Sequence, residues 1–333
     1  MPVIVFYDVN GNGLQDGNEH AIVPAATVRI LNRSGETAAG SGLATLRVAA
    51  GSWTASIQSL PAYYEAGPAA AVSVPIADGQ PVRLPATLPI GENRPSVYMA
   101  FGDSITEGEG SEDETGYRSK LQARLAEWFG AGRIENQAIG GTRSNMGAGR
   151  IKRSLSDVQP AYTLILYGTN DWNDSRCRND FPCFTVDALR SMIRQARKAQ
   201  SLPILSTIIP VNTGFSGLAP ASRNEWVKSM NELIVPMAAE EGAVVADNYT
   251  AFMAVPDFHT LFFDHVHPND DGYDIMVSQF FDAITQPRPA PSALGPGVPL
   301  LLPPPGSFPE FVPADPADVP QAPRWDPQAQ GRR

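Results

Sequence analysis

Short apolar runs alternate with helical patterns between residues 96 and 284, and this alternation constrains the fold more than any other feature of the chain. Strands are expected at residues 96–101, 133–139, 161–167, 203–211 and 243–246. Helices are expected at residues 117–128, 144–158, 186–199, 225–241 and 273–284, the fourth of them kinked by Pro236. Strands that alternate with helices form a parallel sheet covered on both faces. The predicted fold class of this region is therefore α/β.

Ser104 stands where the first expected strand turns towards a helix, and open α/β sheets bind their ligands at that edge. About 160 residues downstream, Asp264 and His267 supply a carboxylate and an imidazole in a short fixed spacing. A serine hydroxyl becomes a nucleophile only when a neighbouring base removes its proton, and a third group must orient that base. These three side chains predict acyl transfer, which makes the chain a candidate serine esterase.

Four motifs in the region from residue 95 to residue 286 resemble those of the SGNH (GDSL) hydrolase family. They are GDSIT at residues 102–106, NQAIGG at 136–141, GTND at 168–171 and DHVHPN at 264–269. Each motif alone is weak, but four in the right order on the right elements are specific. The resemblance implies a flavodoxin-like parallel sheet with helices on both faces.

The resemblance also implies a role for each motif. Ser104 would be the nucleophile, His267 the base that takes its proton, and Asp264 the group that orients the imidazole. The oxyanion hole would consist of the backbone N–H groups of Ser104 and Gly141 and the side-chain amide of Asn170, with Gly140 as the alternative to Gly141. The scheme needs no metal or organic cofactor for catalysis.

Neighbouring residues have competing interpretations. His265 is a rival base, because it lies two residues from His267 and on the same side of an extended segment. Asp103 and Asp171 are expected to bond local backbone N–H groups. Core, surface or packing positions are expected, in preference to the substrate cleft or the catalytic site, for His20, Tyr117, Trp172, His259 and Tyr273.

Residues 8–19, DVNGNGLQDGNE, fit a twelve-position calcium loop. The sixth position is Gly13, which permits the sharp turn of such a loop. The expected ligands are the side chains of Asp8, Asn10, Asn12 and Asp16, the carbonyl of Leu14 and the bidentate carboxylate of Glu19. The competing interpretation is an ordinary Asn- and Gly-rich turn that binds nothing.

The segments that flank this loop read as strands, and further β-type runs follow, separated by Gly, Pro and Ser turns. Residues 2–90 therefore resemble the SdrD B-like calcium-binding β-sandwich modules of bacterial surface proteins. The expected organisation has three parts. They are a β-sandwich module with a structural Ca²⁺ at residues 1–94, a catalytic domain at 95–286 and a Pro-rich disordered tail at 287–333, which holds 14 of the 31 prolines.

Charge and cysteine content predict the environment of the protein. A net charge of −10 and a pI near 4.9 disfavour nucleic acid and anionic membranes as partners. No apolar run reaches the ~18 residues of a membrane span. Cys177 and Cys183 are expected to form a local disulfide, which indicates a secreted or extracellular protein, although two free thiols stay open as an alternative. A strand expected from residue 3 leaves no room for a signal peptide, so secretion requires a processed form.

The expected substrate is a short acyl ester, because residues 102–108 and 116–118 look closest to members that remove acetyl groups from polysaccharides. The predicted function is that of a secreted carbohydrate deacetylase acting on an acetylated polysaccharide. The alternatives are a general short-chain lipase, aryl esterase or thioesterase and, as a different class, a non-catalytic surface adhesin. The sequence leaves the acyl group, the alcohol and the oligomeric state open.

Overall fold

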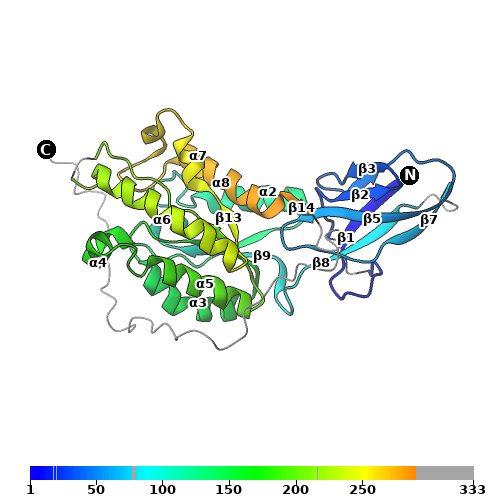
Figure 1. Ribbon diagram of the computed structural model, residues 1–333, viewed down its shortest axis with the longest axis horizontal. Helices are drawn as coiled ribbons and strands as arrows, with labels where there is room; N and C mark the ends of the chain where they lie inside the picture. Colours follow the sequence, from blue (N-terminus) through cyan, green and yellow to red (C-terminus); the bar gives the residue numbers. More distant parts are fainter. Residues whose placement is uncertain (18, 20, 77–79, 216, 290–333) are drawn as a thin grey trace.

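The computed structural model describes residues 1–289 except residues 18, 20, 77–79 and 216. The chain forms two parts that lie end to end along the long axis of the molecule, a β-rich part at the N-terminal end and a larger part with helices around a sheet (Figure 1). Within the described residues, no helix has the length and apolar character needed to cross a membrane.

The larger part is built on five parallel strands in the order β10-β9-β11-β12-β13. Their bounds are β9 Arg94–Gly102, β10 Arg133–Asn136, β11 Pro160–Leu166, β12 Leu202–Ser206 and β13 Val244–Ala246. Numbered from β9, the order is 2-1-3-4-5, that of a flavodoxin-like sheet, whose ligand site lies between the first and third strands. The predicted α/β fold class is confirmed.

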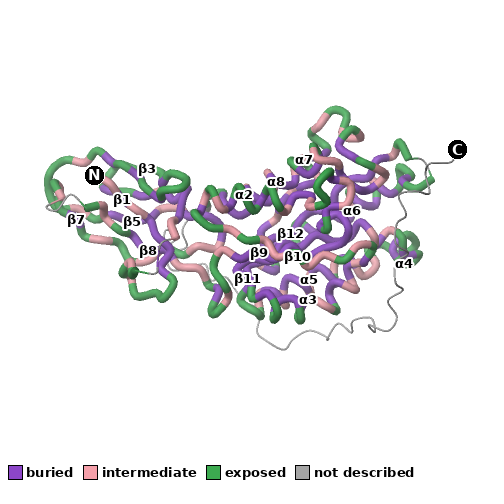
Figure 2. Tube along the Cα trace, turned by 180° about the vertical axis from the view of Figure 1, so that it is seen from behind, coloured by how far each residue is buried: buried purple, intermediate pink, exposed green. Residues whose placement is uncertain are grey.

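Helices cover both faces of this sheet. One face carries α2 and α8, whose apolar sides join the same buried cluster, and the other carries α3, α5 and α6. The sheet between them is buried along most of its length (Figure 2). The helix bounds are α2 Tyr117–Phe129, α3 Ser144–Val158, α5 Thr185–Lys198, α6 Ala221–Glu240 and α8 Asp270–Thr285, with Pro236 inside α6.

The expected strand at residues 203–211 is too long. β12 ends at Ser206. The backbone N–H groups of two buried residues that follow donate to side chains and not to a neighbouring strand. Ile208 N–H donates to Asn231 Oδ1 at 2.9 Å and Val211 N–H to Asn224 Oδ1 at 2.7 Å, both on α6. An apolar run indicates burial but does not show which groups satisfy its backbone hydrogen bonds. The predicted strand therefore extends beyond Ser206.

Several short elements have too few residues for a periodic pattern and were not predicted. They are the helices α1 Ser104–Glu107, α4 Ser175–Asn179 and α7 Asn248–Met253 and the 3₁₀ helices η1 Asp171–Asn173 and η2 Phe258–Leu261. Most of them lie in the loops at the carboxyl ends of the strands or close to those loops. Side chains cap three of them, since Asp103, Asp174 and Asp247 accept the first free N–H groups of α1, α4 and α7.

The N-terminal part is all β and contains two sheets, as the sequence predicts. One sheet has the order β4-β1-β8-β6, and the other has the order β14-β5-β2-β3 with β7 also paired to β5. The bounds are β1 Pro2–Tyr7, β2 Thr27–Ile30, β3 Arg33–Glu36, β4 Leu43–Thr45, β5 Gly51–Pro61, β6 Glu65–Ala66, β7 Ala70–Val74, β8 Val82–Thr87 and β14 Pro287–Pro289.

Strand β14 changes the expected limits of the tail. It follows α8 directly and pairs antiparallel with β5, so that Pro287 lies opposite Pro61. The first three residues of the predicted tail therefore belong to the sheet of the N-terminal part. The remainder of that prediction, from residue 290 onwards, falls outside the described residues.

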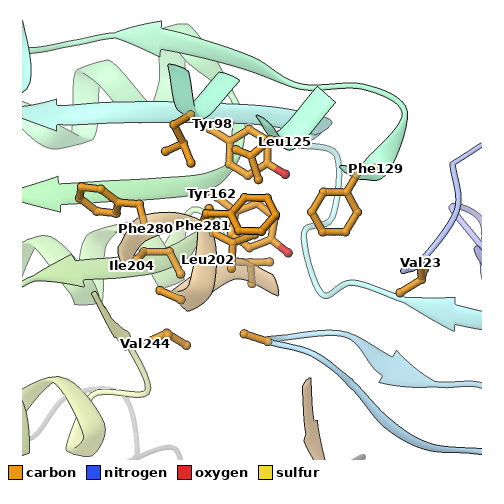
Figure 3. Close-up of a cluster of buried hydrophobic side chains, with 14 of the residues drawn as sticks. Val23, Tyr98, Leu125, Phe129, Tyr162, Leu202, Ile204, Val244, Phe280 and Phe281 are labelled. Atoms are coloured by element: carbon orange, nitrogen blue, oxygen red, sulfur yellow. The ribbon is translucent and has the colours of Figure 1, made fainter. Parts of the chain in front are cut away.

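A continuous apolar cluster joins the two parts of the molecule. Figure 3 shows Tyr98, Tyr162 and Phe129 within this cluster, and the rings of Tyr98 and Tyr162 stack with centroids 5.1 Å apart. Tyr63, from the N-terminal part, reaches the amino end of the sheet. Its hydroxyl donates to Pro203 O at 2.5 Å and accepts the N–H of Val244 at 3.0 Å.

Replacing Tyr63 by Phe should lower the free energy of unfolding by about 1–3 kcal/mol, because it leaves a buried carbonyl and a buried N–H without that partner. Urea unfolding followed by tryptophan fluorescence measures the change. Tyr162→Phe is the matched control, since in the described structure the buried Tyr162 hydroxyl has no hydrogen-bond partner. Equal stability of Tyr63→Phe and the wild type would show that the bridge contributes nothing.

Candidate active site

The nucleophile turn follows β9, one of the two strands that flank the switch point of the sheet. Asp103 caps α1 by accepting the N–H of Ile105 at 3.1 Å, and Ser104 begins the helix with only 7% of its surface exposed. Gly102 ends the strand in a space that admits no side chain. A Cβ at this position would lie 2.6 Å from the carbonyl oxygen of Leu166 and 2.0 Å from Thr106 Oγ1. The turn therefore requires glycine immediately before the Asp-Ser pair.

The structure brings Ser104, His267 and Asp264 together in one hydrogen-bonded chain. Ser104 Oγ lies 2.8 Å from His267 Nε2, and His267 Nδ1 lies 2.8 Å from Asp264 Oδ2. The other carboxylate oxygen, Oδ1, accepts the backbone N–H groups of Val266 and His267, both at 2.8 Å. Asp264 is thus held by its own loop, and its Oδ2 fixes the orientation of the imidazole.

The charges in this chain shift the pKa values in opposite directions. Burial raises the pKa of Asp264, but the hydrogen bond and charge of His267 and the two backbone donors outweigh it and lower this pKa to about 2. Burial lowers the pKa of His267, but the hydrogen bond and charge of Asp264, with the charges of Glu109 and Asp103, raise it above its ordinary value. Asp264 is therefore ionised whenever His267 titrates, and it stabilises the imidazolium.

The residues predicted to complete the oxyanion hole with Ser104 lie on two loops next to its turn. Gly140 packs against Ser104, because a Cβ at Gly140 would come 3.6 Å from the Ser104 Cβ, and Gly141 follows with a φ of 71°. Asn170 follows β11, the second strand at the switch point. Its Nδ2 donates to Asp103 Oδ2 at 3.1 Å and to Thr142 O at 3.2 Å. Binding of an oxyanion would therefore exchange one of these two acceptors for the substrate oxygen.

Asp103 bonds a local backbone N–H as the sequence suggests, but Asp171 does not, because its partners in the described structure lie 14 and 27 residues away. Asp171 accepts Ser144 N–H and the hydroxyls of Ser144 and Thr185, which joins α3 and α5 to the loop after β11. Asp103 bonds its local backbone and also the amide of Asn170. Burial raises the pKa of Asp103 to about 7, against the opposing effects of the Ile105 N–H and the charge of His267.

The rival histidines lie outside the serine–histidine bond. His265 Nδ1 is 3.8 Å from Asp264 Oδ1, and its ring lies beside Phe215. His259 Nε2 is 3.0 Å from the hydroxyl of Thr213. His20 falls outside the described residues. Tyr117 and Tyr273 are fully buried, as expected, and Trp172 packs against the ring of Trp226.

Sequence reasoning missed two charged residues near the site. Glu109 Oε2 lies 3.2 Å from His267 Nε2. Arg223 is 2% exposed and donates from Nη2 to the carbonyl of Thr169, the residue before Asn170, at 2.8 Å. Its positive charge interacts with both Asp103 and Asp264, while burial lowers its pKa to about 10. Glu109 lies within seven residues of the GDSIT motif and could have been noticed; Arg223 has no motif to mark it.

Two predicted features lie away from the triad. Cys177 and Cys183 are joined in a disulfide at the loop that follows β11, and Trp226 Nε1 donates to Cys177 O at 3.0 Å.

In the N-terminal loop, Asp8 accepts Gly11 N–H and Gly13 N–H, both at 2.7 Å. Among the described residues, no three or more His, Cys, Asp or Glu side chains lie close enough to hold a metal ion.

The site at the switch point of a flavodoxin-like sheet, with its linked serine, histidine and aspartate, is that of a carboxylic ester hydrolase. A family model for the GDSL-like Lipase/Acylhydrolase family matches residues 100–275, and the chain belongs to this family. Esterase TesA from Pseudomonas aeruginosa is 31% identical over 119 residues, which are 35% of this chain and 57% of that esterase. The family predicted from the four motifs is confirmed.

Solved structures with similar folds cover the larger part of the chain. The crystal structure of TesA has a TM-score of 0.46 and 22% identity, over 56% of this chain and 97% of that one. Axe2, an acetylxylan esterase from Geobacillus stearothermophilus, has a TM-score of 0.47 and 19% identity, over 58% of this chain and 95% of that one.

The imidazole of His267 should titrate with a pKa above the ordinary 6.5, and Asp264→Asn should lower that pKa because the neutral amide no longer favours the imidazolium. NMR titration of the histidine ring protons measures both values. Asp271→Asn, at an exposed aspartate on α8, is the control and should leave His267 unchanged. An unchanged value in Asp264→Asn would mean that the two side chains do not interact in solution.

Proposed function

We propose that this protein is a secreted serine esterase that hydrolyses short acyl esters, chiefly acetyl esters of polysaccharides. The observation that carries the proposal is the continuous hydrogen-bonded chain from Ser104 through His267 to Asp264. Nucleophile and base lie within the distance that proton transfer requires, and the base is oriented by an ionised carboxylate. A surface adhesin has no need of this arrangement.

The reaction proceeds in two steps. Ser104 Oγ attacks the ester carbonyl while its proton moves to His267 Nε2, and the oxyanion forms beside the N–H groups of Ser104 and Gly141 and the Asn170 amide. The bond to the alcohol oxygen then breaks, and Nε2 returns the proton to that oxygen. In the second step water attacks the acyl-serine, His267 takes a proton from the water, and the Oγ–carbonyl bond breaks as Oγ is reprotonated.

The loops around the triad offer apolar surface to a substrate. Exposed apolar side chains stand on the loops that carry the site, namely Ile139 before Gly140, Phe215 beside His265 and Phe263 next to Asp264. Apolar and aromatic surfaces beside convergent polar groups are typical of small-molecule sites. The Cys177–Cys183 disulfide supports an oxidising, extracellular environment.

A general short-chain esterase is the second candidate. The similarity to Esterase TesA favours it, because that protein's name records an esterase without a carbohydrate substrate. The match spans only 57% of that esterase, so its activity is carried over to this chain as a proposal. The two candidates share the triad and differ in the alcohol that they release.

Assays on p-nitrophenyl acetate and on acetylated xylan, with Ser104→Ala as the inactive control, separate the candidates. Serine-dependent acetate release from both substrates is expected. Loss of the nucleophile should reduce turnover by about 10⁶-fold, since the members of such a triad act as a unit. Activity on the small ester alone would select the general esterase, and full activity of Ser104→Ala on either substrate would refute the mechanism.

We further propose that the N-terminal loop at residues 8–19 binds a structural Ca²⁺. Asp8 and Glu19 are 3% and 4% exposed, and no ion pair in the described structure neutralises either of them. Glu19 turns into the loop, where it accepts the N–H groups of Val9 at 2.8 Å and Asp16 at 3.0 Å. Asp8, Asn10, Asn12, Asp16, Glu19 and the Leu14 carbonyl would supply oxygen ligands, the type that Ca²⁺ prefers. The loop would have to contract around the ion, because its three carboxylates are not close enough in the described structure to hold a metal.

Calcium should raise the melting temperature of the full-length protein, and chelation should reverse the change, because a ligand that binds only the folded state stabilises it. Differential scanning calorimetry with Ca²⁺ and with EDTA measures the shift. Glu19→Gln should abolish the response, while Glu36→Gln, on β3, should retain it. A melting temperature that does not depend on Ca²⁺ would identify the loop as an ordinary turn.

A further inference from the structure

Glu109 places a second carboxylate at the nitrogen of His267 that exchanges protons with the substrate. Its Oε2 lies 3.2 Å from Nε2, the same atom that Ser104 Oγ approaches at 2.8 Å. The Glu109 side chain is 39% exposed, whereas that of His267 is only 11% exposed. The carboxylate therefore contacts both solvent and the imidazole of His267.

The backbone around Glu109 is held firmly in this place. Glu109 N–H donates to Ser104 O at 3.1 Å, and the hydroxyl of the buried Tyr273 donates to Glu109 O at 2.7 Å. Gly110 presses against the loop of the base, because a Cβ at Gly110 would come 2.5 Å from Pro268 O and 3.2 Å from the His267 Cβ. The backbone of Glu109 is therefore tied both to Ser104 and to the loop that carries His267.

The chemistry of ester cleavage determines which part of the substrate meets Glu109. Nε2 must protonate the alcohol oxygen as the tetrahedral intermediate collapses, so that oxygen comes within hydrogen-bond distance of Nε2. Glu109 Oε2 lies 3.2 Å from the same nitrogen. The carbons next to the alcohol oxygen, with their substituents, therefore lie beside this carboxylate. The acyl group lies on the other side of the reacting carbon.

We propose that Glu109 is the specificity-determining residue for the alcohol and accepts a hydrogen bond from a hydroxyl on the carbon adjacent to the ester-bearing carbon. An ionised carboxylate is purely an acceptor, and hydrogen bonds to it are stronger than those between neutral groups. Acetylated sugars carry such a vicinal hydroxyl, whereas aryl and simple alkyl esters do not. The inference rests on the proposed esterase activity and narrows its substrate class.

The charge on the same rim argues against anionic substrates. Glu107 lies over the loop expected to hold the oxyanion, since its Oε2 would be 2.8 Å from a Cβ at Gly140. The nearby Arg118 is occupied by carbonyls, donating to Thr106 O and Glu107 O at 2.9 Å each. Two carboxylates thus flank the nucleophile, so a neutral polyhydroxylated alcohol suits the site and an acidic sugar does not.

Two small esters that differ by one methyl group test the proposal: 2-hydroxyethyl acetate offers a vicinal hydroxyl, and 2-methoxyethyl acetate offers none. The wild type should show a kcat/KM at least about tenfold higher for the hydroxy ester, the value of one charge-assisted hydrogen bond. Glu109→Ala should reduce the ratio of the two kcat/KM values to about one. Glu112→Ala, an exposed glutamate three residues further along the same loop, should keep the wild-type ratio.

Each outcome decides one question. A ratio that Glu109→Ala leaves at the wild-type value, or a wild type that does not distinguish the esters, overturns the role of Glu109 while the esterase stands. If the wild type hydrolyses none of the three, neither of these esters nor p-nitrophenyl acetate, the proposed function itself is overturned. Both ratios are measured at a pH on the plateau of activity, so that the influence of Glu109 on His267 titration cancels between the two substrates.

Discussion

The close approach of β9 and β11 at the switch point is the constraint on which the site depends. Gly102 permits it, because the carbonyl of Leu166 and the hydroxyl of Thr106 occupy the space that any larger residue would need. The two strands deliver Ser104 and Asn170 to the same edge, and Asp103 connects them through its bond to the Asn170 amide. Ser104 and Asn170 thus lie on two neighbouring turns that one side chain connects.

The base reaches this turn from a distant part of the chain, and local backbone bonds hold it there. Oδ1 of Asp264 accepts the N–H groups of its own loop, and Oδ2 bonds to His267. These bonds restrain rotation of the carboxylate. Arg223 adds positive charge behind Asp103 and Asp264 without touching the reacting atoms. A buried cation of this kind offsets the cost of placing two carboxylates in a small volume.

Periodic patterns and the four motifs allowed the sheet, the larger helices and the triad to be predicted, since apolar spacing reports burial directly. What the sequence could not show depends on folding geometry. The end of β12 at Ser206 is set by the asparagines of α6. Glu109 gains its importance only because Gly110 and Tyr273 bring it to His267, and Arg223 belongs to a helix whose register no motif reveals.

Strand β14 gives the molecule a second covalent link between its parts, in addition to the connection from β8 to β9. A module on a single linker is free to reorient, whereas two connections and a shared apolar core restrict that movement. Tyr63 lies at the same junction and ties the N-terminal part to the edge of the catalytic sheet. A surface bound by the N-terminal part would therefore meet the active-site edge of the sheet at a restricted angle.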